Sequence, residues 1–243
     1  MKEKKYLNTI IIAVAVILAI EVIILAVVMN SNTEAVELNT ENNINSTETE
    51  LKENMQEEQV IETIKPLEEE IDVSQVDGFY IKVNYEANVV TIYIKDEEGN
   101  YTRPYKVMTC STGTATPHNG VYKVSDKGKW GMMVGRVWAQ YYTRITGQIL
   151  FHSVPYTSKS PSTLEYWEYD KLGTTASAGC VRLTVKDAKW IFDNCKPGTQ
   201  VEFYADSDPG PLGKPEMLKI SNVSEELRGW DPTDMDSNNP WNN

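Results

Sequence analysis

Histidine is scarce in this chain of 243 residues, which contains only His118 and His152. Catalytic zinc needs several protein ligands, often closely spaced histidines, and neither H-x-H nor H-E-x-x-H occurs. The glycine patterns that bind nucleotide phosphates, G-x-G-x-x-G and G-K-S/T, are also absent. We therefore expect chemistry without a metal or a cofactor, and we expect no nucleic-acid partner.

Cysteine is nearly as scarce, and one of the three cysteines stands in a pattern typical of a nucleophile. Cys180 lies in the small-residue segment 177–183, 28 positions after His152. A thiol attacks as a thiolate, which an imidazole, a cation or a helix N-terminus stabilises. His152 and Arg182 supply the first two, and the helix predicted to begin at Thr184 supplies the third. The alternative is a core cysteine, because free cysteines are among the most buried residues.

The two histidines stand in different surroundings. His118 lies in a turn-rich stretch, where an exposed polar residue is the ordinary expectation. His152 follows the apolar run 149–151 and so ends a predicted strand, although a structural core histidine is the alternative. Ala178 and Gly179 are small enough to let the backbone approach a substrate carbonyl, where two N–H groups could form an oxyanion hole.

These residues carry a resemblance to a known family. The pattern Ser177-x-Gly179-Cys180-Val181-Arg182, preceded by His152-Ser153 and by Thr114-Ala115-Thr116-Pro117-x-x-Gly120, resembles the YkuD-type L,D-transpeptidases of bacterial cell walls. The resemblance covers roughly residues 78–204. That family commonly has a histidine at the position of Ala178, so a second imidazole is not expected to act here.

The resemblance implies a role for each matching residue. Cys180 is the nucleophile, His152 the base, and Ser153 the neighbour whose backbone carbonyl orients the imidazole. The amides of Gly179 and Cys180 form the oxyanion hole, and Arg182 is either structural or substrate-facing. Further contacts with the substrate are expected from Ser177, Ala178 and Tyr142.

The implied reaction is peptidoglycan L,D-transpeptidation. Cys180 forms a thioester with a tetrapeptide stem at its third residue, displacing the terminal D-alanine, and an amine of a neighbouring stem resolves it to a 3→3 cross-link. Carbapenems acylate enzymes of this family. Two alternatives stay open: a thiol-dependent L,D-carboxypeptidase or endopeptidase, in which water resolves the thioester, and a non-catalytic wall-binding module.

The N-terminal residues predict a location at the membrane. Residues 10–29 form an apolar run of about 20 residues, long enough to cross a bilayer as a helix. Lys2, Lys4 and Lys5 precede the run, which favours a cytoplasmic N-terminus and a catalytic domain on the cell-wall side. No small-x-small cleavage site ends the run, so we favour a single-pass anchor over a cleaved signal peptide.

The chain then divides by composition. Residues 31–72 contain 13 acidic residues and two lysines, a net charge of −11 of the chain's −12, which predicts a disordered, extended linker. The expected organisation is an anchor at 1–30, a linker at 31–76, a catalytic domain at 77–205 and a Pro/Gly/Asn-rich tail at 206–243.

The catalytic domain is expected to be mainly β, an antiparallel β-sandwich-like fold with one main helix after the cysteine motif. Alternation and β-branched runs favour seven strands. The helix covers 184–195, where Thr184 and Asp187 form a capping box. The predicted strands cover 81–85, 89–94, 105–108, 120–124, 138–145, 148–152 and 199–204.

Three further features have two readings each. The insertion 155–175 is a lid that grips a peptide, a small helix at 163–172 packed on the sheet, or both at once. Cys110 and Cys195 form a disulfide outside the cell, or remain reduced.

The aromatic residues Trp130, Trp138, Tyr141 and Tyr142 line the cleft or belong to the core. The tail is expected to run along the surface as a strap.

Overall fold

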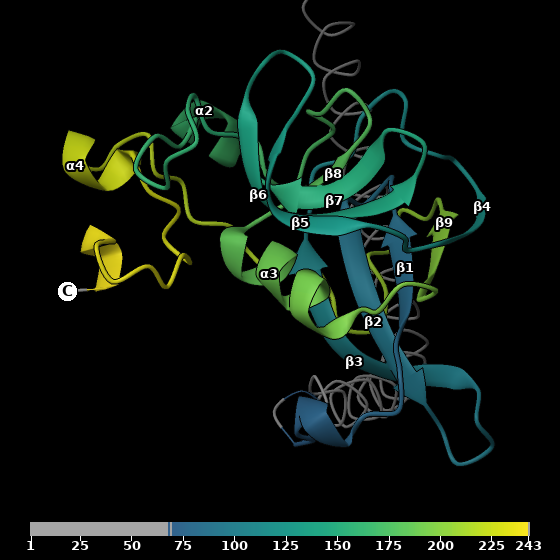
Figure 1. Cartoon of the computed structure of the whole chain (residues 1–243). Helices are drawn as coiled ribbons and strands as arrows, with labels where there is room; N and C mark the ends of the chain where they lie inside the picture. Colours follow the sequence, from purple (N-terminus) through teal and green to yellow (C-terminus); the bar gives the residue numbers. More distant parts are fainter. Residues whose placement is uncertain (1–67, 69, 243) are drawn as a thin grey trace, which may run out of the picture. The chain divides into compact units, whose positions relative to one another are not determined.

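A computed structural model describes residue 68 and residues 70–242 (Figure 1). The predicted anchor and most of the predicted linker lie outside these residues, so both stay predictions there. The last residues of the predicted linker belong to the folded domain instead, because Ile71, Val73 and Val76 pack on its hydrophobic core and the Tyr105 hydroxyl donates to the Ile71 carbonyl at 3.0 Å. Within the described residues, no helix has the length and apolar character needed to span a bilayer.

Two mixed β-sheets form the domain. The first sheet has the strand order β3-β2-β1-β9-β4, and the second has the order β5-β6-β7-β8 (Figure 1). The strands are β1 (Tyr80–Asn84), β2 (Val89–Lys95), β3 (Tyr101–Thr109), β4 (Gly120–Lys123), β5 (Lys127–Met132), β6 (Trp138–Thr146), β7 (Ile149–Ser153), β8 (Val181–Leu183) and β9 (Gln200–Tyr204). The helices are α2 (Tyr166–Tyr169), α3 (Val185–Asn194) and α4 (Glu225–Arg228), with short 3₁₀ turns at Val73–Gln75 and Pro240–Asn242.

The domain is mainly β, as predicted, but its sheets are mixed and not antiparallel throughout. In the first sheet β1 and β9 run parallel, and in the second sheet β7 and β8 run parallel. Both pairs join strands that lie far apart in the sequence, and local alternation carries no information about such pairing.

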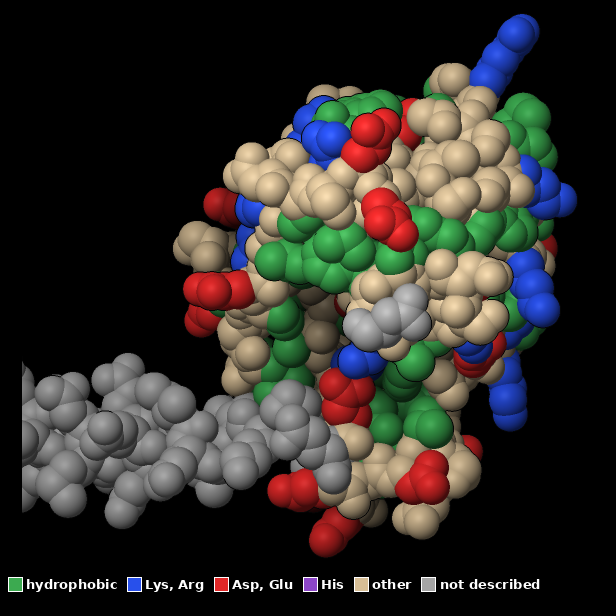
Figure 2. Space-filling model, turned by 90° about the vertical axis from the view of Figure 1, so that its left-hand side faces the viewer, with side chains coloured by type: hydrophobic (Ala, Val, Ile, Leu, Met, Phe, Trp, Pro, Cys, Tyr) green, Lys and Arg blue, Asp and Glu red, His purple; other side chains and the backbone are tan. Residues whose placement is uncertain are grey.

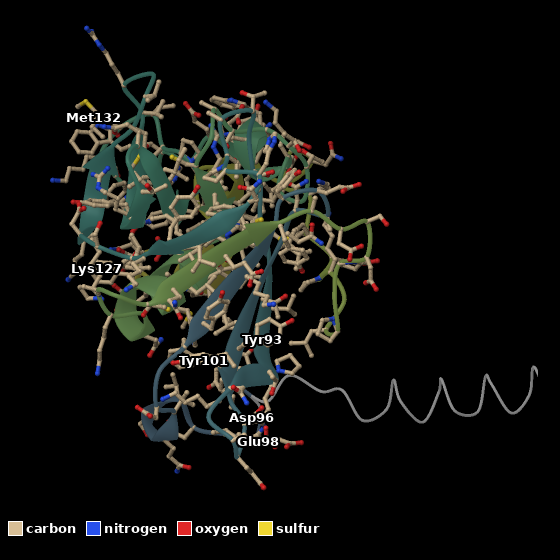
Figure 3. All side chains as sticks on the ribbon, turned by 90° about the vertical axis from the view of Figure 1, so that its right-hand side faces the viewer. Tyr93, Asp96, Glu98, Tyr101, Lys127 and Met132 are labelled. Carbon is tan, nitrogen blue, oxygen red and sulfur yellow. The ribbon has the colours of Figure 1, made fainter. Side chains whose placement is uncertain are left out.

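All seven predicted strands are present, whereas β5 and β8 were missed. β8 has only three residues, which is too short for a periodic pattern. β5 contains Gly128 and Gly131, and glycine weakens a strand signal. Figure 3 labels the two ends of β5, Lys127 and Met132, and shows Met132 far from the β2–β3 hairpin that carries Asp96 and Glu98.

The main helix is confirmed together with its cap. The Thr184 side chain accepts a hydrogen bond from the Asp187 N–H at 3.2 Å. α3 packs against β6, β7 and β8, and its buried face contributes Ala188 and Ile191 to the larger hydrophobic core, which includes residues of both sheets. The helix therefore covers one face of the second sheet and leaves the opposite face for other contacts.

A smaller hydrophobic core covers part of that opposite face. It joins the insertion 155–175, the start of α3 and the C-terminal segment, which we define as residues 206–242. Its buried members are Val154, Tyr156, Leu164, Tyr169, Leu172, Val185 and Ile220. Figure 2 shows a band of apolar side chains on the side of the domain that carries α2 and α4.

The C-terminal segment is more than a surface strap. Ile220, Asp231 and Asn239 are fully buried, and Asp231 accepts a hydrogen bond from the first α3 amide, that of Val185, at 2.9 Å. Trp241, whose docking the sequence left open, packs on the smaller core and donates to the Leu227 carbonyl at 2.9 Å. The segment is thus part of the folded domain.

Cys110 and Cys195 are both buried free thiols, so the disulfide is not formed in this structure. Burial raises the pKa of both thiols, that of Cys195 to about 12. Neither group therefore competes with Cys180 as a thiolate at neutral pH.

Candidate active site

The register of the second sheet brings the predicted site residues onto one face. His152 lies directly opposite Arg182 across the parallel β7–β8 pair. Cys180 comes one residue before β8, so the same register sets it opposite Leu150. Because side chains two residues apart share a face, Cys180 and His152 point to the same side. Strand spacing and rise put their Cα atoms about 8 Å apart, as diagonal neighbours.

A cavity of about 440 Å³ opens on this face and holds both residues. Its floor comes from β6, β7 and the cysteine loop, and its wall from the β5–β6 hairpin. The residues predicted for the site that line it are His152, Cys180, Ser177, Ala178, Gly179, Arg182 and Tyr142. The sequence thus identified the residues of one continuous cavity, apart from Ser153, whose side chain lies on the opposite face.

His152 is held as a neutral imidazole with a defined tautomer. Its Nδ1 lies 2.6 Å from the Ser153 carbonyl oxygen, which can only accept, so Nδ1 carries the hydrogen. Nε2 then keeps its lone pair. Burial, reinforced by the nearby Arg182 charge, lowers the pKa of His152 to about 4, against the opposing effect of the Ser153 hydrogen bond. The ring is therefore an unprotonated base at neutral pH.

Cys180 is a half-buried thiol in the same cavity. Burial raises its pKa, although the Leu150 amide and the charges of Arg182 and Arg144 act in the opposite direction. Its Sγ donates a hydrogen bond to the Gln148 carbonyl at 3.4 Å in this conformation. A neutral thiol beside a neutral imidazole favours proton transfer during attack over a preformed ion pair.

The helix N-terminus does not act on Cys180 as the sequence suggested. β8 separates Cys180 from α3, which places the helix start about 13 Å away at strand rise. The influence of a helix terminus falls off within its first turn. In addition, the first α3 amides already donate to Asp231, Thr233 and Thr184.

The cysteine loop is held by hydrogen bonds of its own side chains. Ser177 Oγ donates to the Cys180 carbonyl at 2.6 Å and accepts from the Gly179 N–H at 3.1 Å. Gly179 N–H is therefore occupied, whereas Cys180 N–H makes no hydrogen bond within residues 70–242. The loop thus offers the Cys180 amide to an oxyanion, and Ser177 stabilises the turn.

The segment 113–116, between β3 and β4, supports the cysteine loop. Thr116 Oγ1 is buried and donates to the Gly179 carbonyl at 2.7 Å. Ala115 N–H donates to the Ala178 carbonyl at 3.0 Å. A Cβ on Gly113 would lie 2.1 Å from the Ser177 carbonyl oxygen, so only glycine permits this approach.

Arg182 is held in an internal network, which favours its structural reading. Its Nη1 donates to the Glu168 carboxylate and to the Ala176 carbonyl. Glu168 belongs to α2 and also pairs with Lys171. Arg182 nevertheless borders the cavity, so its charge contributes to the field at Cys180.

Comparison with known proteins agrees with this geometry. A family model of the YkuD L,D-transpeptidase catalytic domain matches residues 78–203, just over half of the chain. The chain belongs to this family. The protein YciB of Bacillus subtilis (strain 168), named as an L,D-transpeptidase, is 41% identical over 90 residues, which are 36% of this chain and 45% of YciB. The chain therefore spans less than half of that relative's length.

Solved structures give weaker likenesses. An L,D-transpeptidase from Mycobacterium smegmatis is 19% identical with a TM-score of 0.42, over 52% of this chain and 58% of that one. A fused Zn-dependent amidase/peptidase/peptidoglycan-binding domain-containing protein from Clostridium acetobutylicum is 24% identical with a TM-score of 0.40, over 59% and 61%.

In this L,D-transpeptidase domain the segment predicted as a lid, residues 155–175, does not cover the cavity. The insertion 155–175 contributes only Pro155 to the cavity, while Tyr156 and Tyr169 are buried in the smaller core. Its helical part, α2, is shorter than the predicted helix at 163–172. The packed-helix reading therefore describes this insertion, because its aromatic side chains meet the C-terminal segment instead of the cavity.

The β5–β6 hairpin covers the cavity instead. It contributes Trp130, Met132, Met133, Val134 and Val137, and Val134 is 85% exposed. The Tyr142 ring lies over Gly128 and Gly131, where any Cβ would come within 2.8 Å of it. In the sequence, these two glycines were the available sign that another group packs on this strand, since glycine in a strand often marks a close approach to its backbone.

Of the four aromatic residues predicted to line the cleft or belong to the core, Trp130 and Tyr142 line the cavity. Trp130 also packs on the smaller core, where its ring stands edge-on to Tyr156. Trp138 and Tyr141 pack on the smaller core, and Tyr141 also stands edge-on to Phe192 of α3. His118, which was not expected to be catalytic, is exposed and stacks on Tyr85 at 4.7 Å.

Proposed function

We propose that this domain catalyses peptidoglycan L,D-transpeptidation with Cys180 as the nucleophile. The donor is a tetrapeptide stem, attacked at the carbonyl of its third residue. The acceptor is an amine of a neighbouring stem, and the product is a 3→3 cross-link. Membership of the L,D-transpeptidase family and the cavity shared by Cys180 and His152 support this proposal.

In the first half-reaction Sγ of Cys180 bonds to the carbonyl carbon and its proton passes to Nε2 of His152. Rotation about the Cα–Cβ bond of Cys180 moves Sγ from the Gln148 carbonyl toward Nε2. The oxyanion forms beside the Cys180 amide. The imidazolium then gives its proton to the leaving nitrogen, the C–N bond breaks, and D-alanine departs from the thioester.

In the second half-reaction an amine attacks the thioester carbon. Nε2 takes a proton from the amine as the new C–N bond forms. The C–S bond breaks, and the sulfur recovers its proton from the imidazolium. Hydrolysis follows the same steps with water in place of the amine, so the balance between cross-linking and carboxypeptidase activity depends on the acceptor.

We also propose that the chain works on the outer side of the cytoplasmic membrane. The apolar run 10–29 with lysines before it supports a single-pass anchor. The acidic linker then lets the domain reach the wall above the membrane. Protease protection of the chain in spheroplasts measures this orientation, and resistance of the domain to external protease that is lost only on lysis contradicts it.

The observation that best supports the chemistry is the 2.6 Å contact between Nδ1 of His152 and the Ser153 carbonyl oxygen. Because Nδ1 is committed to the Ser153 carbonyl, Nε2 is the nitrogen left as a base on the cavity face. The burial that lowers the pKa of His152 to about 4 keeps it unprotonated at neutral pH. A structural core histidine needs no such lone pair directed to a cavity.

Intact-mass measurement of the full-length chain tests the proposal. We expect a covalent adduct with a carbapenem, and release of D-alanine from a disaccharide-tetrapeptide. Cys180→Ser should lose both, while Cys110→Ala, which removes a buried thiol of the larger core, should keep both. An adduct that persists in Cys180→Ser, or a folded wild-type chain with neither adduct nor release, contradicts the mechanism.

A further inference from the structure

The lining of the cavity contains cations and no carboxylate. Two guanidinium groups, Arg144 and Arg182, border it, and none of its lining residues is an aspartate or a glutamate. Such a lining attracts an anionic part of a ligand.

Arg144 was not singled out by the sequence, and the sheet register explains its position. Arg144 on β6 pairs with Leu150 on β7, and Leu150 lies opposite Cys180. The three side chains therefore form one row across the sheet and point to the cavity face. Two strand spacings place the Cα atoms of Arg144 and Cys180 about 10 Å apart.

Two contacts hold the Arg144 guanidinium and leave one edge open. Nε donates to Asp126 at 2.7 Å, and Nη1 donates to the Gly147 carbonyl at 2.5 Å. Nη2 makes no hydrogen bond within residues 70–242. The side chain is 30% exposed, against 16% for Arg182, whose Nη1 is tied to Glu168. Of the two cations, Arg144 is the more accessible to a ligand.

We propose that Arg144 binds the carboxylate of the amino acid that leaves the donor stem. This inference depends on the proposed function, because it names a contact of the same donor. Consecutive Cα atoms are about 3.8 Å apart, so the terminal carboxylate lies about 4 Å beyond the attacked carbonyl. When that carbonyl lies at Sγ of Cys180 and the last residue of the donor follows the row of side chains toward Arg144, the carboxylate lies within reach of the long arginine side chain.

The consequence is a preference for donors that end in a free carboxylate. A charge-assisted hydrogen bond from a guanidinium to a carboxylate is stronger than one to a neutral amide. A C-terminal carboxamide keeps the shape of the donor and removes its charge. We expect kcat/KM for the carboxylate donor to exceed that for the carboxamide donor by about 10- to 100-fold.

The experiment compares two donors on the full-length chain. One is a disaccharide-tetrapeptide with a free terminal carboxylate, and the other is the same molecule with a terminal carboxamide. Release of D-alanine or D-alaninamide gives kcat/KM for each. Arg144→Gln should reduce the ratio of the two values to about 1, mainly by lowering the rate with the carboxylate donor, and Arg144→Lys should give an intermediate ratio.

The ratio cancels any general loss of folded protein, because both donors meet the same enzyme. Lys129→Gln is the matched control: it removes a cation of the neighbouring strand that does not border the cavity, and it should preserve the ratio. Equal rates with both donors in the wild-type chain, or an unchanged ratio in Arg144→Gln, overturn this inference while the transpeptidase function stands. No release from either donor by wild type overturns both.

Discussion

Asp231→Asn tests how the C-terminal segment stabilises the catalytic domain. The Asp231 carboxylate is fully buried and accepts three hydrogen bonds: from the Val185 amide at 2.9 Å, and from the amide and hydroxyl of Thr233 at 2.8 and 2.6 Å. Asparagine keeps the size of the side chain. Its NH₂ group must face one of these donors, which costs about 1 to 3 kcal/mol of folding free energy.

The cost depends on pH because the carboxyl titrates. Burial raises the pKa of Asp231 to about 6 from its ordinary value of 3.8, against the lowering effect of its hydrogen bonds to Thr233 and Val185. A raised pKa in the folded state gives stability that is complete below pH 3.8 and is lost as the pH rises through 6. Between pH 5 and pH 8 the wild-type chain should lose about 1.4 kcal/mol through this group, and the asparagine variant should lose none of it.

Urea unfolding followed by tryptophan fluorescence at pH 5 and pH 8 measures both effects. We expect Asp231→Asn to be less stable than wild type at pH 5, with a difference about 1.4 kcal/mol smaller at pH 8. Contributions of His152 cancel because both proteins contain it. Asp231→Ala should be less stable than the asparagine variant at both pH values, since it leaves the Val185 amide without a partner. A stability difference between wild type and Asp231→Asn that is constant or grows with pH refutes the assignment of a buried Asp231 carboxyl with a raised pKa.

Three predictions concern the active site. Because the pKa of His152 is lowered to about 4, kcat/KM for acylation should keep its neutral-pH value down to about pH 5 and halve near pH 4; a midpoint at 6.5 contradicts the neutral buried base. Gly113→Ala should lower kcat/KM on the order of 100-fold, because the new Cβ pushes the cysteine loop, whereas Gly99→Ala, which strains a positive-φ turn of the β2–β3 hairpin without touching the cysteine loop, should keep it. Ser177→Ala should lower kcat about 10-fold by loosening the loop, with a serine of the insertion, Ser160→Ala, as its control; equal rates in both variants contradict that role for Ser177.

Local sequence patterns predicted most of the secondary structure and the candidate site residues. Alternating and β-branched runs predicted seven strands, because the pleat exposes alternate residues to different faces. The hydroxyl and carboxylate of Thr184 and Asp187 predicted the helix start, since capping acts within one turn. The small-residue motif indicated Cys180 as the candidate nucleophile, and the family resemblance indicated His152 as the candidate base with the Ser153 carbonyl beside it.

Tertiary structure alone decided which side chains share the cavity. Arg144 and residues 132–137 at the tip of the β5–β6 hairpin carry no local signal of function, and they border the site only because β6 pairs with β7 in one register and β7 with β8 in another. The C-terminal segment is part of the domain because Ile220 fills the smaller core and Asp231 accepts a hydrogen bond from the first α3 amide. No residue close to α3 in the sequence makes these contacts. Contacts between remote parts of a chain depend on strand pairing and packing, and the periodicity of a short segment contains neither.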